Sequence, residues 1–438
     1  MSRTFRRYTD SGIIRSRRGA GILCVVAASV GSAFANPLAV QPLTNEFQVN
    51  TVTNLAPFRP SVATLTDDGF IVAWEIPGQA AGQRYDAAGT AVGGEFLITE
   101  EPPLAPVVDT VSVAGTGNGG FAAVWRRSPS AALLGDIVSR VFDMSGNPEG
   151  PEFEVAASPG EQQYPVTVGS GAGFVVTWAD DYDYSIQIQA TGEGSFQHQV
   201  SEGVAIRGPD VAIGARGGFV VVWTERYAGD VSVYGRLTSV DGEPTAERFE
   251  LGSDPGSFGT KPAVGTAAKK NHLAVWRGPA LEIVARPLNG RAVPYGPNVI
   301  ISDPIFENNL DPDVNDTDGS GMFVVVWQTG YTNKSSPIPI VENGSDGDAE
   351  AIDGLLLRDG VPVGEQFTVN TYSTADQQRP AIARNRDGIY LVVWESEGST
   401  GDDTLGGSIA GRFLFDNALL FRDGFELGNM AAWDGVVR

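Results

Sequence analysis

Two residue types that carry much of enzyme chemistry are nearly missing from this chain of 438 residues. It has one cysteine, Cys24, and two histidines, His198 and His272. Cys24 lies in the N-terminal segment that we expect to be removed, so the mature chain has no disulfide, thiol nucleophile or thiolate metal site. The two histidines exclude a histidine-rich metal site and make a Ser-His-Asp triad hard to assemble. We therefore expect no catalytic residue and no cofactor of these kinds.

Positive charge is also scarce, with 30 Lys and Arg against 53 Asp and Glu. The N-terminal segment, residues 1–35, holds six of the arginines and one aspartate, so its removal leaves 24 basic and 52 acidic residues, a net charge of −28. Such a surface repels phosphate backbones and anionic lipids, which argues against nucleic-acid and direct membrane partners. The acidic residues are scattered along the chain, as expected for a solvated surface.

The chain has no apolar run long enough for a transmembrane helix, which needs about 20 residues. Its longest candidate, residues 20–30, follows six arginines and precedes Ala33-Phe34-Ala35. Basic residues, a short apolar stretch and an A-x-A site in this order predict a secretory signal peptide, residues 1–35, cleaved after Ala35. We expect a secreted or periplasmic bacterial protein without a membrane span, and both the general and the twin-arginine export routes stay open.

One apolar hexapeptide occurs seven times, and each copy ends in tryptophan. A short run of β-branched and aromatic residues opened by a glycine turn is typical of a strand that is covered on both faces. Successive copies are 45 to 67 residues apart, in the range of repeat architectures. The tryptophans are Trp74, Trp125, Trp178, Trp223, Trp276, Trp327 and Trp394.

Three further motifs keep a constant order around each tryptophan strand. A Pro-x-Val-Ala motif precedes it, as at Pro60, and we expect this proline at the first residue of a strand, where no ladder donor is lost. A Gly-Arg-x-Phe motif and a Glu-Phe-x-Val motif follow, as at Arg236 and Phe249. Four short strands per repeat with Gly and Asp turns and no helical pattern predict a blade of a β-propeller. We predict an all-β, seven-bladed propeller with four-stranded blades.

The two ends of the repeat region predict how the ring closes. Residues 46–51 match the outer strand at residues 366–371, although no repeat precedes them. The last repeat lacks that strand, so we expect residues 46–51 to complete the last blade. The propeller then spans residues 36–419, with a polar insertion at residues 331–351, which is either a binding loop or a plain surface loop. A tail, residues 420–438, has no assigned role.

The combined pattern resembles repeats of large secreted and surface bacterial proteins, including calcium-binding hemolysin-type ones. It covers residues 46–415 and implies architecture, not chemistry. It is also distantly similar to the FG-GAP propeller of integrins, whose calcium loops have the form Asp-x-Asp-x-Asp-Gly. This chain departs from those loops in nearly every blade.

One acidic stretch is a calcium candidate. Asp313, Asn315, Asp316 and Asp318 present oxygen ligands near a glycine, as Ca²⁺ requires. Asp316 stands where an EF-hand loop needs glycine, however, and no distal glutamate is in register. The repeat alignment places this stretch at the hairpin between the first two strands, where Asp and Gly are ordinary turn formers.

We therefore expect a binding or scaffolding module, a monomer, with a protein or a carbohydrate as its partner. The repeated tryptophans favour core packing over sugar stacking, because they share one strand position. The alternative is a secreted carbohydrate-active hydrolase that uses two carboxylates at the channel mouth. Acidic residues with raised pKa values at that mouth would favour the hydrolase, and a featureless face would favour the binding module.

Overall fold

The computed structural model describes most of the chain from residue 40 to residue 416. The described ranges are 40–100, 107–129, 134–156, 158–171, 173–181, 184–191, 195–201, 205–214, 217–227, 230–253, 261–267, 271–302, 309–316, 321–333, 340–342, 344–398 and 407–416. The predicted signal peptide, residues 1–35, and the tail, residues 420–438, lie outside them.

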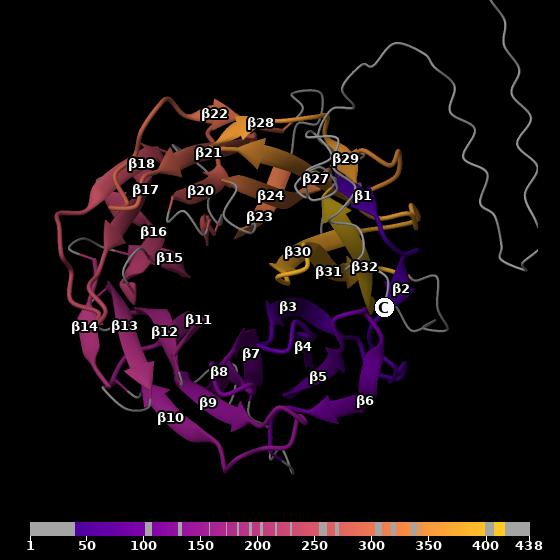
Figure 1. Ribbon diagram of the computed structural model, residues 1–438, viewed down its shortest axis with the longest axis horizontal. Helices are drawn as coiled ribbons and strands as arrows, with labels where there is room; N and C mark the ends of the chain where they lie inside the picture. Colours follow the sequence, from indigo (N-terminus) through magenta and orange to yellow (C-terminus); the bar gives the residue numbers. More distant parts are fainter. Residues whose placement is uncertain are drawn as a thin grey trace, which may run out of the picture. The chain divides into compact units, whose positions relative to one another are not determined.

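Seven antiparallel sheets form a ring around a central channel, and the described residues contain no α-helix (Figure 1). The predicted seven-bladed β-propeller is confirmed. Each blade runs outward from an inner strand at the channel, and the tryptophan strand comes second. Within the described ranges, no helix has the length and apolarity to cross a membrane.

The first five blades each use four consecutive strands. Blades 1 to 3 contain β3 (Phe58–Thr64), β4 (Phe70–Ile76), β5 (Gln79–Tyr85), β6 (Ala91–Leu97); β7 (Val107–Gly115), β8 (Phe121–Ser128), β9 (Asp136–Phe142), β10 (Phe153–Ala156); and β11 (Gln162–Ser170), β12 (Gly173–Asp180), β13 (Ser185–Thr191), β14 (Gln197–Gln199). Blades 4 and 5 contain β15 (Ala205–Ile213), β16 (Phe219–Tyr227), β17 (Asp230–Leu237), β18 (Phe249–Ser253); and β19 (Ala263–Thr266), β20 (His272–Arg277), β21 (Ile283–Leu288), β22 (Val299–Ile300).

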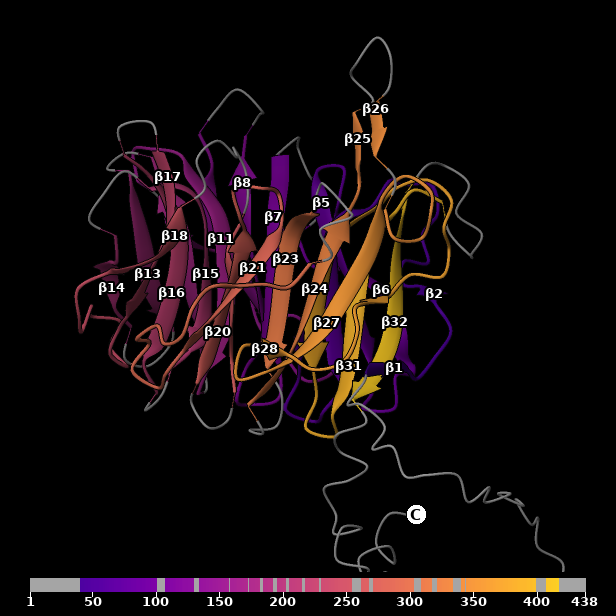
Figure 2. The same cartoon turned by 90° about the horizontal axis from the view of Figure 1, so that it is seen from above.

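The last two blades have an outer strand in two short pieces. Blade 6 contains β23 (Asn309–Asp316), β24 (Met322–Thr329), β27 (Ala351–Arg358), β28 (Val361–Pro362) and β29 (Phe367–Thr368). Blade 7 contains β30 (Gln377–Arg384), β31 (Ile389–Ser396), β32 (Ser408–Asp416), β1 (Val40–Pro42) and β2 (Phe47–Gln48). The predicted insertion in blade 6 carries a separate hairpin, β25 (Tyr331–Asn333) and β26 (Ile340–Glu342), which stands out from one face of the ring (Figure 2).

The N-terminal strand closes the ring as predicted. β2 pairs with β32 through Phe47 and Gly411, and the backbone N–H of Val49 donates to the Ile409 carbonyl at 2.7 Å. Glu46 links this strand to blade 6, because its Oε2 accepts hydrogen bonds from Thr371 N at 2.6 Å and Thr371 Oγ1 at 2.9 Å. Strand β1 also pairs with β32, an addition that the repeat pattern did not predict.

The tryptophan strands form the core between neighbouring blades. All seven repeated tryptophans are fully buried, with exposed fractions of 0 or 1%. Trp125 of blade 2, for example, packs in one apolar cluster with Ile71 and Ala73 of blade 1. This burial explains why the second strand is apolar on both faces, and it removes these seven side chains from any sugar-binding surface. Trp433 lies outside the described residues.

The Gly-Arg-x-Phe and Glu-Phe-x-Val motifs join the blades. The arginine of the third strand donates from Nη1 to a backbone carbonyl in or directly after the outer strand of the preceding blade, as Arg236 does to Val200 at 2.9 Å. The glycine makes room for the outer phenylalanine, since a Cβ at Gly235 would lie 2.5 Å from the Phe249 ring. The same arginine bond occurs from Arg140 to Ile98 at 3.1 Å, Arg286 to Leu251 at 3.1 Å and Arg412 to Val369 at 2.7 Å.

Candidate functional site

Six of the seven inner strands carry a β-bulge at the same height along the channel. The pairing register shifts between Phe58 and Ser61, Asp109 and Ser112, Gln163 and Val166, Arg207 and Asp210, Leu310 and Asp313, and Gln378 and Ala381. The motif proline, such as Pro60, therefore lies inside the strand and not at its first residue, which corrects the sequence prediction. A proline is tolerated there because the bulge already interrupts the ladder.

The bulges hold five side chains in a backbone conformation that residues other than glycine rarely adopt. The φ angles of these residues are positive: Arg59 47°, Thr110 54°, Tyr164 56°, Asp311 44° and Arg379 49°. Each such residue costs roughly 1–3 kcal/mol and persists only where its surroundings enforce it. A bulge re-aims its side chain, and here the re-aimed side chains line the channel.

The bulges leave some backbone N–H groups without a partner in the strand ladder. Polar side chains of the preceding blade accept hydrogen bonds from these N–H groups. The N–H of Thr110 donates to Glu75 Oε1, that of Arg59 to Glu395 Oε1, and that of Arg379 to Gln328 Oε1. The three acceptors share one position, because each directly follows a repeated tryptophan. Burial raises the pKa of Glu75 to about 7, with Arg59 opposing that rise.

In four of the six bulged blades, the side chain of the residue after the bulge makes a second hydrogen bond between blades. Ser61 Oγ accepts from Val113 N at 3.2 Å, and Ser112 Oγ accepts from Thr167 N at 3.2 Å. In blades 4 and 6 carboxylates take the same position. Asp210 Oδ2 accepts from Val264 N at 2.7 Å, and Asp313 Oδ2 accepts from Ile382 N at 2.8 Å.

The two carboxyls at this position have raised pKa values. Burial is the main cause and raises the pKa of Asp210 to about 7 and that of Asp313 to about 6. The charge of Asp313 raises the pKa of Asp210 further, while the backbone N–H groups oppose the rise at both. The side chains of Asp210 and Asp313 are half-buried, with protein on most sides and the channel on the remaining one.

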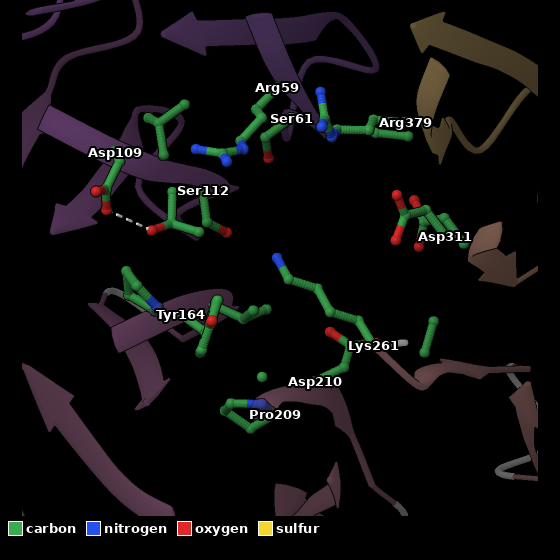
Figure 3. Close-up of a pocket in the computed structure, with 18 of the residues that line it drawn as sticks. Arg59, Ser61, Asp109, Ser112, Tyr164, Pro209, Asp210, Lys261, Asp311 and Arg379 are labelled. Atoms are coloured by element: carbon green, nitrogen blue, oxygen red, sulfur yellow. Dashed lines mark hydrogen bonds between the residues drawn. The ribbon is translucent and has the colours of Figure 1, made fainter. Parts of the chain in front are cut away.

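These residues surround a cavity of about 630 Å³ at the start of the inner strands, which we call the channel mouth (Figure 3). All seven blades contribute to its wall. The hairpin β25–β26 leaves the ring on the same face, because β24 ends at Thr329, opposite Asn309 at the start of β23. The volume is within the range of small-molecule sites.

Charged side chains of both signs point into the channel mouth. Arg59, Lys261 and Arg379 extend into the opening from blades 1, 5 and 7 (Figure 3). Arg59 Nη1 lies 3.3 Å from Glu75 Oε2, and Arg379 Nη1 lies 2.6 Å from Glu395 Oε2. The positive charge of each arginine is therefore compensated by a glutamate that lies behind the cavity wall.

Lys261 and Asp311 are different. Within the described part of the chain, neither the Lys261 ammonium nor the Asp311 carboxylate has a hydrogen bond or an ion pair; Lys261 Nζ lies 5.8 Å from the centre of the Tyr164 ring. Burial lowers the pKa of Lys261, and the charge of Asp311 opposes that change. The channel mouth thus contains one donor and one acceptor that are not engaged by described residues.

Three of the four calcium candidates lie on an inner strand and not in a turn. Asp313, Asn315 and Asp316 belong to β23, so the predicted hairpin position is wrong for them. Asp313 is held by the backbone N–H groups of Val314 at 2.9 Å and Ile382 at 2.8 Å. Asp318 lies outside the described residues. Among the residues described, no three His, Cys, Asp or Glu side chains form a group that could hold a metal, and calcium binding stays a prediction.

Three other polar residues, one of them a histidine, have structural contacts. His272 is buried, its Nδ1 lies 2.7 Å from Thr266 Oγ1, and burial lowers its pKa to about 4. In the insertion, Asp346 Oδ2 accepts from Asn370 Nδ2 at 2.7 Å, and Asp348 Oδ2 accepts from Ala375 N at 3.2 Å. These two aspartates tie the insertion to blade 6.

The fold and this site define a seven-bladed β-propeller with a charged channel mouth. No protein-family model matches the sequence, and no curated protein matches it. Solved structures with a similar chain trace include AofleA from Arthrobotrys oligospora, with 11% identity, a TM-score of 0.46, and coverage of 75% of this chain and 91% of that one.

Two further structures are similar to the same degree. A protein of unknown function from Dyadobacter fermentans has 12% identity, a TM-score of 0.47, and coverage of 86% of this chain and 99% of that one. The α-L-arabinofuranosidase Arb93A from Fusarium graminearum, solved with an iminosugar inhibitor, has 11% identity, a TM-score of 0.47 and the same coverage. At these values the similarities do not bear on what this chain binds.

Proposed function

We propose that this protein is an exported binding module that takes a saccharide into the channel mouth. The observation that carries the proposal is the pair Lys261 and Asp311, a charged donor and a charged acceptor in one cavity with no bonded partner in the described chain. Both residues are half-buried, and a ligand in the cavity that forms charge-assisted hydrogen bonds with them gains affinity.

Hydroxyl groups fit this pair because one hydroxyl can donate to Asp311 and a neighbouring one can accept from Lys261. The ring of Tyr164 lines the same cavity and offers a flat face for the C–H side of a sugar. A plain carboxylate ligand fits less well, since Asp210, Asp311 and Asp313 share the cavity with the cations.

The test is a titration of the mature chain, residues 36–438, with neutral mono- and disaccharides, in which calorimetry or ligand-observed NMR detects binding. The Lys261→Met variant should lose at least about tenfold in affinity, because a hydrogen bond to a charged donor is removed. Arg291→Met, at an exposed residue in the turn before β22, is the matched control and should bind unchanged. Absence of any saccharide binding, or equal affinity of Lys261→Met, would refute the proposal.

A hydrolase is the second candidate, and the raised pKa values of Asp210 and Asp313 favour it. A carboxyl with a pKa of about 7 is suited to act as a general acid near neutral pH. Both carboxyls, however, already accept backbone N–H groups of the next blade, which favours a structural role. Turnover of aryl glycosides that is lost in Asp210→Asn and Asp313→Asn would establish the hydrolase, whereas binding without turnover supports the binding module.

A further inference from the structure

A second cavity lies at the opposite end of the inner strands. It has a volume of about 440 Å³, and we call it the distal pocket. Thr64, Gly115 and Arg384, the last residues of β3, β7 and β30, line it together with Gly169 near the end of β11. The channel mouth is lined by the first residues of the same strands, so the two cavities are separate.

Arg384 is the unusual residue of the distal pocket. Its Nε and Nη2 are both buried, and neither has a hydrogen-bond partner among the described residues. The guanidinium lies over the ring of Tyr390, its cross-strand neighbour, with Cζ 5.5 Å from the ring centre. The ring keeps the cation in place without accepting its N–H groups. Two N–H groups of one guanidinium therefore have no acceptor in the part of the chain that the structure describes.

The inner strands leave the wall of the distal pocket as bare backbone on one side. A Cβ at Gly169 would lie 1.9 Å from the Gly115 carbonyl oxygen, and one at Gly115 would lie 2.3 Å from the Thr64 carbonyl oxygen. Only glycine fits where the strands approach this closely, so no side chain of these two residues fills the pocket. The Thr64 hydroxyl, in turn, donates to the Arg384 carbonyl at 2.7 Å.

The remaining charges of the distal pocket permit a small anion. Arg386 is exposed and adds a second cation. Asp68 is the one carboxylate among the described lining residues, and the backbone N–H of Arg386 donates to its Oδ1 at 3.1 Å. Arg386 Nη1 lies 3.9 Å from Asp68 Oδ2, so this negative charge is partly compensated.

We infer that the distal pocket binds a small oxyanion through Arg384. The Nε and Nη2 groups of a guanidinium form a fork that matches two oxygens of a carboxylate, sulfate or phosphate. Free anions and anionic groups of a larger molecule share this chemistry. The inference does not depend on the saccharide proposal, since the two cavities share no lining residue.

The experiment titrates the mature chain with sodium sulfate, sodium phosphate and sodium acetate, with sodium chloride at matched ionic strength as reference. Calorimetry or a melting shift should detect saturable binding of the oxyanions beyond the effect of chloride. Arg384→Met should weaken it at least about tenfold, as expected when a bidentate charged bond is lost, and Arg384→Lys should restore part of it. Lys261→Met and Arg291→Met are the controls and should bind the oxyanions as the wild type does.

If replacing Arg384 unfolds the chain, a variant that leaves Arg384 in place provides an independent test. Asp68 has a φ of 63°, a conformation that asparagine tolerates, so Asp68→Asn should keep the turn. Removing this negative charge should tighten oxyanion binding several-fold. Equal effects of chloride and sulfate, or affinity unchanged in both Arg384→Met and Asp68→Asn, would overturn the inference. An acidic sugar such as glucuronate distinguishes a free anion from an anionic group of a larger molecule. If glucuronate binds no more tightly than sulfate, the site recognises the anion alone, and if it binds more tightly, the site recognises the anionic group of a larger molecule. Both outcomes support the oxyanion site.

Discussion

Replacing Glu75 by glutamine should stabilise the protein at alkaline pH. The Glu75 side chain is fully buried, with an exposed fraction of 0%, and it lies between Arg59 Nη1 at 3.3 Å and the backbone N–H of Thr110. Burial raises its pKa from 4.5 to about 7. Between these pH values the native state binds more protons than the unfolded chain, so the free energy of unfolding falls as the pH rises. The penalty is absent below pH 4.5 and complete above pH 7.

The magnitude follows from the same two pKa values. At 1.36 kcal/mol per pH unit, ionising Glu75 in the native state costs about 3 kcal/mol at pH 8. Glutamine keeps the shape and the acceptor oxygen for Thr110 but never ionises. Glu75→Gln should therefore unfold with a free energy about 3 kcal/mol higher than the wild type at pH 8, and with a similar one near pH 4.5.

Urea unfolding followed by tryptophan fluorescence at several pH values measures this difference. Glu247→Gln, at an exposed position before β18, is the control and should show no comparable dependence on pH. The buried carboxyls Asp210 and Asp313 titrate in every variant, so their contribution cancels in the comparison. A Glu75→Gln protein that is less stable at pH 8, or equally stabilised at pH 4.5 and pH 8, would refute the reasoning.

Three further predictions concern the core, the ring closure and calcium. Trp223→Ala should lower the free energy of unfolding by ~3–5 kcal/mol in urea, since it empties a core site and leaves Glu225 without its indole donor; a loss below ~1 kcal/mol would contradict the assigned core. Deleting residues 36–52 should expose the edge of β32 and cause aggregation or loss of cooperative melting, and a truncated protein that stays monomeric and melts unchanged would argue against closure by this strand. Millimolar Ca²⁺ should leave the melting temperature nearly unchanged, and a large Ca²⁺-specific shift that Asp316→Ala or Asp318→Ala removes would show that the acidic stretch is a metal site.

The sequence was sufficient for the fold because the core repeats. Each blade buries the same tryptophan in the same strand, and each Gly-Arg pair meets an outer phenylalanine and a backbone carbonyl of its neighbour. Each of these contacts requires a particular residue type, so the same residue recurs at the same position in each repeat. The displaced strand at residues 46–51 could be recognised for the same reason, because Glu46 and Phe47 have the contacts of an ordinary outer strand.

The channel mouth could not be predicted, because the residues that line it differ from blade to blade while the neighbouring motif residues stay the same. Arg59, Lys261 and Arg379 precede the motif proline in different blades, and the positions of the two arginines follow from bulges whose positive φ angles cannot be predicted from residue type. The only signal was the variety of polar side chains beside an otherwise constant Pro-x-Val-Ala motif. The repeat alignment placed Asp313 in a turn because Asp and Gly are ordinary turn formers, whereas in β23 its carboxylate accepts the backbone N–H of Ile382, in another blade.

The pairing of β2 with β32 has a consequence for how the chain reaches its native state. Phe47 emerges from the ribosome more than 350 residues before its partner Gly411, so blade 7 is incomplete until β32 has been synthesised. Contacts between such distant parts of a chain slow folding, because the long loop must close before the contact forms. During this interval β2 lacks its partner, and after synthesis the unpaired edge of β32 can accept residues 47–48 of a second molecule whose ring is still open. Exchange of this strand between two incompletely folded chains is therefore the misassembly to which this propeller is most exposed, and dilution during refolding should suppress it.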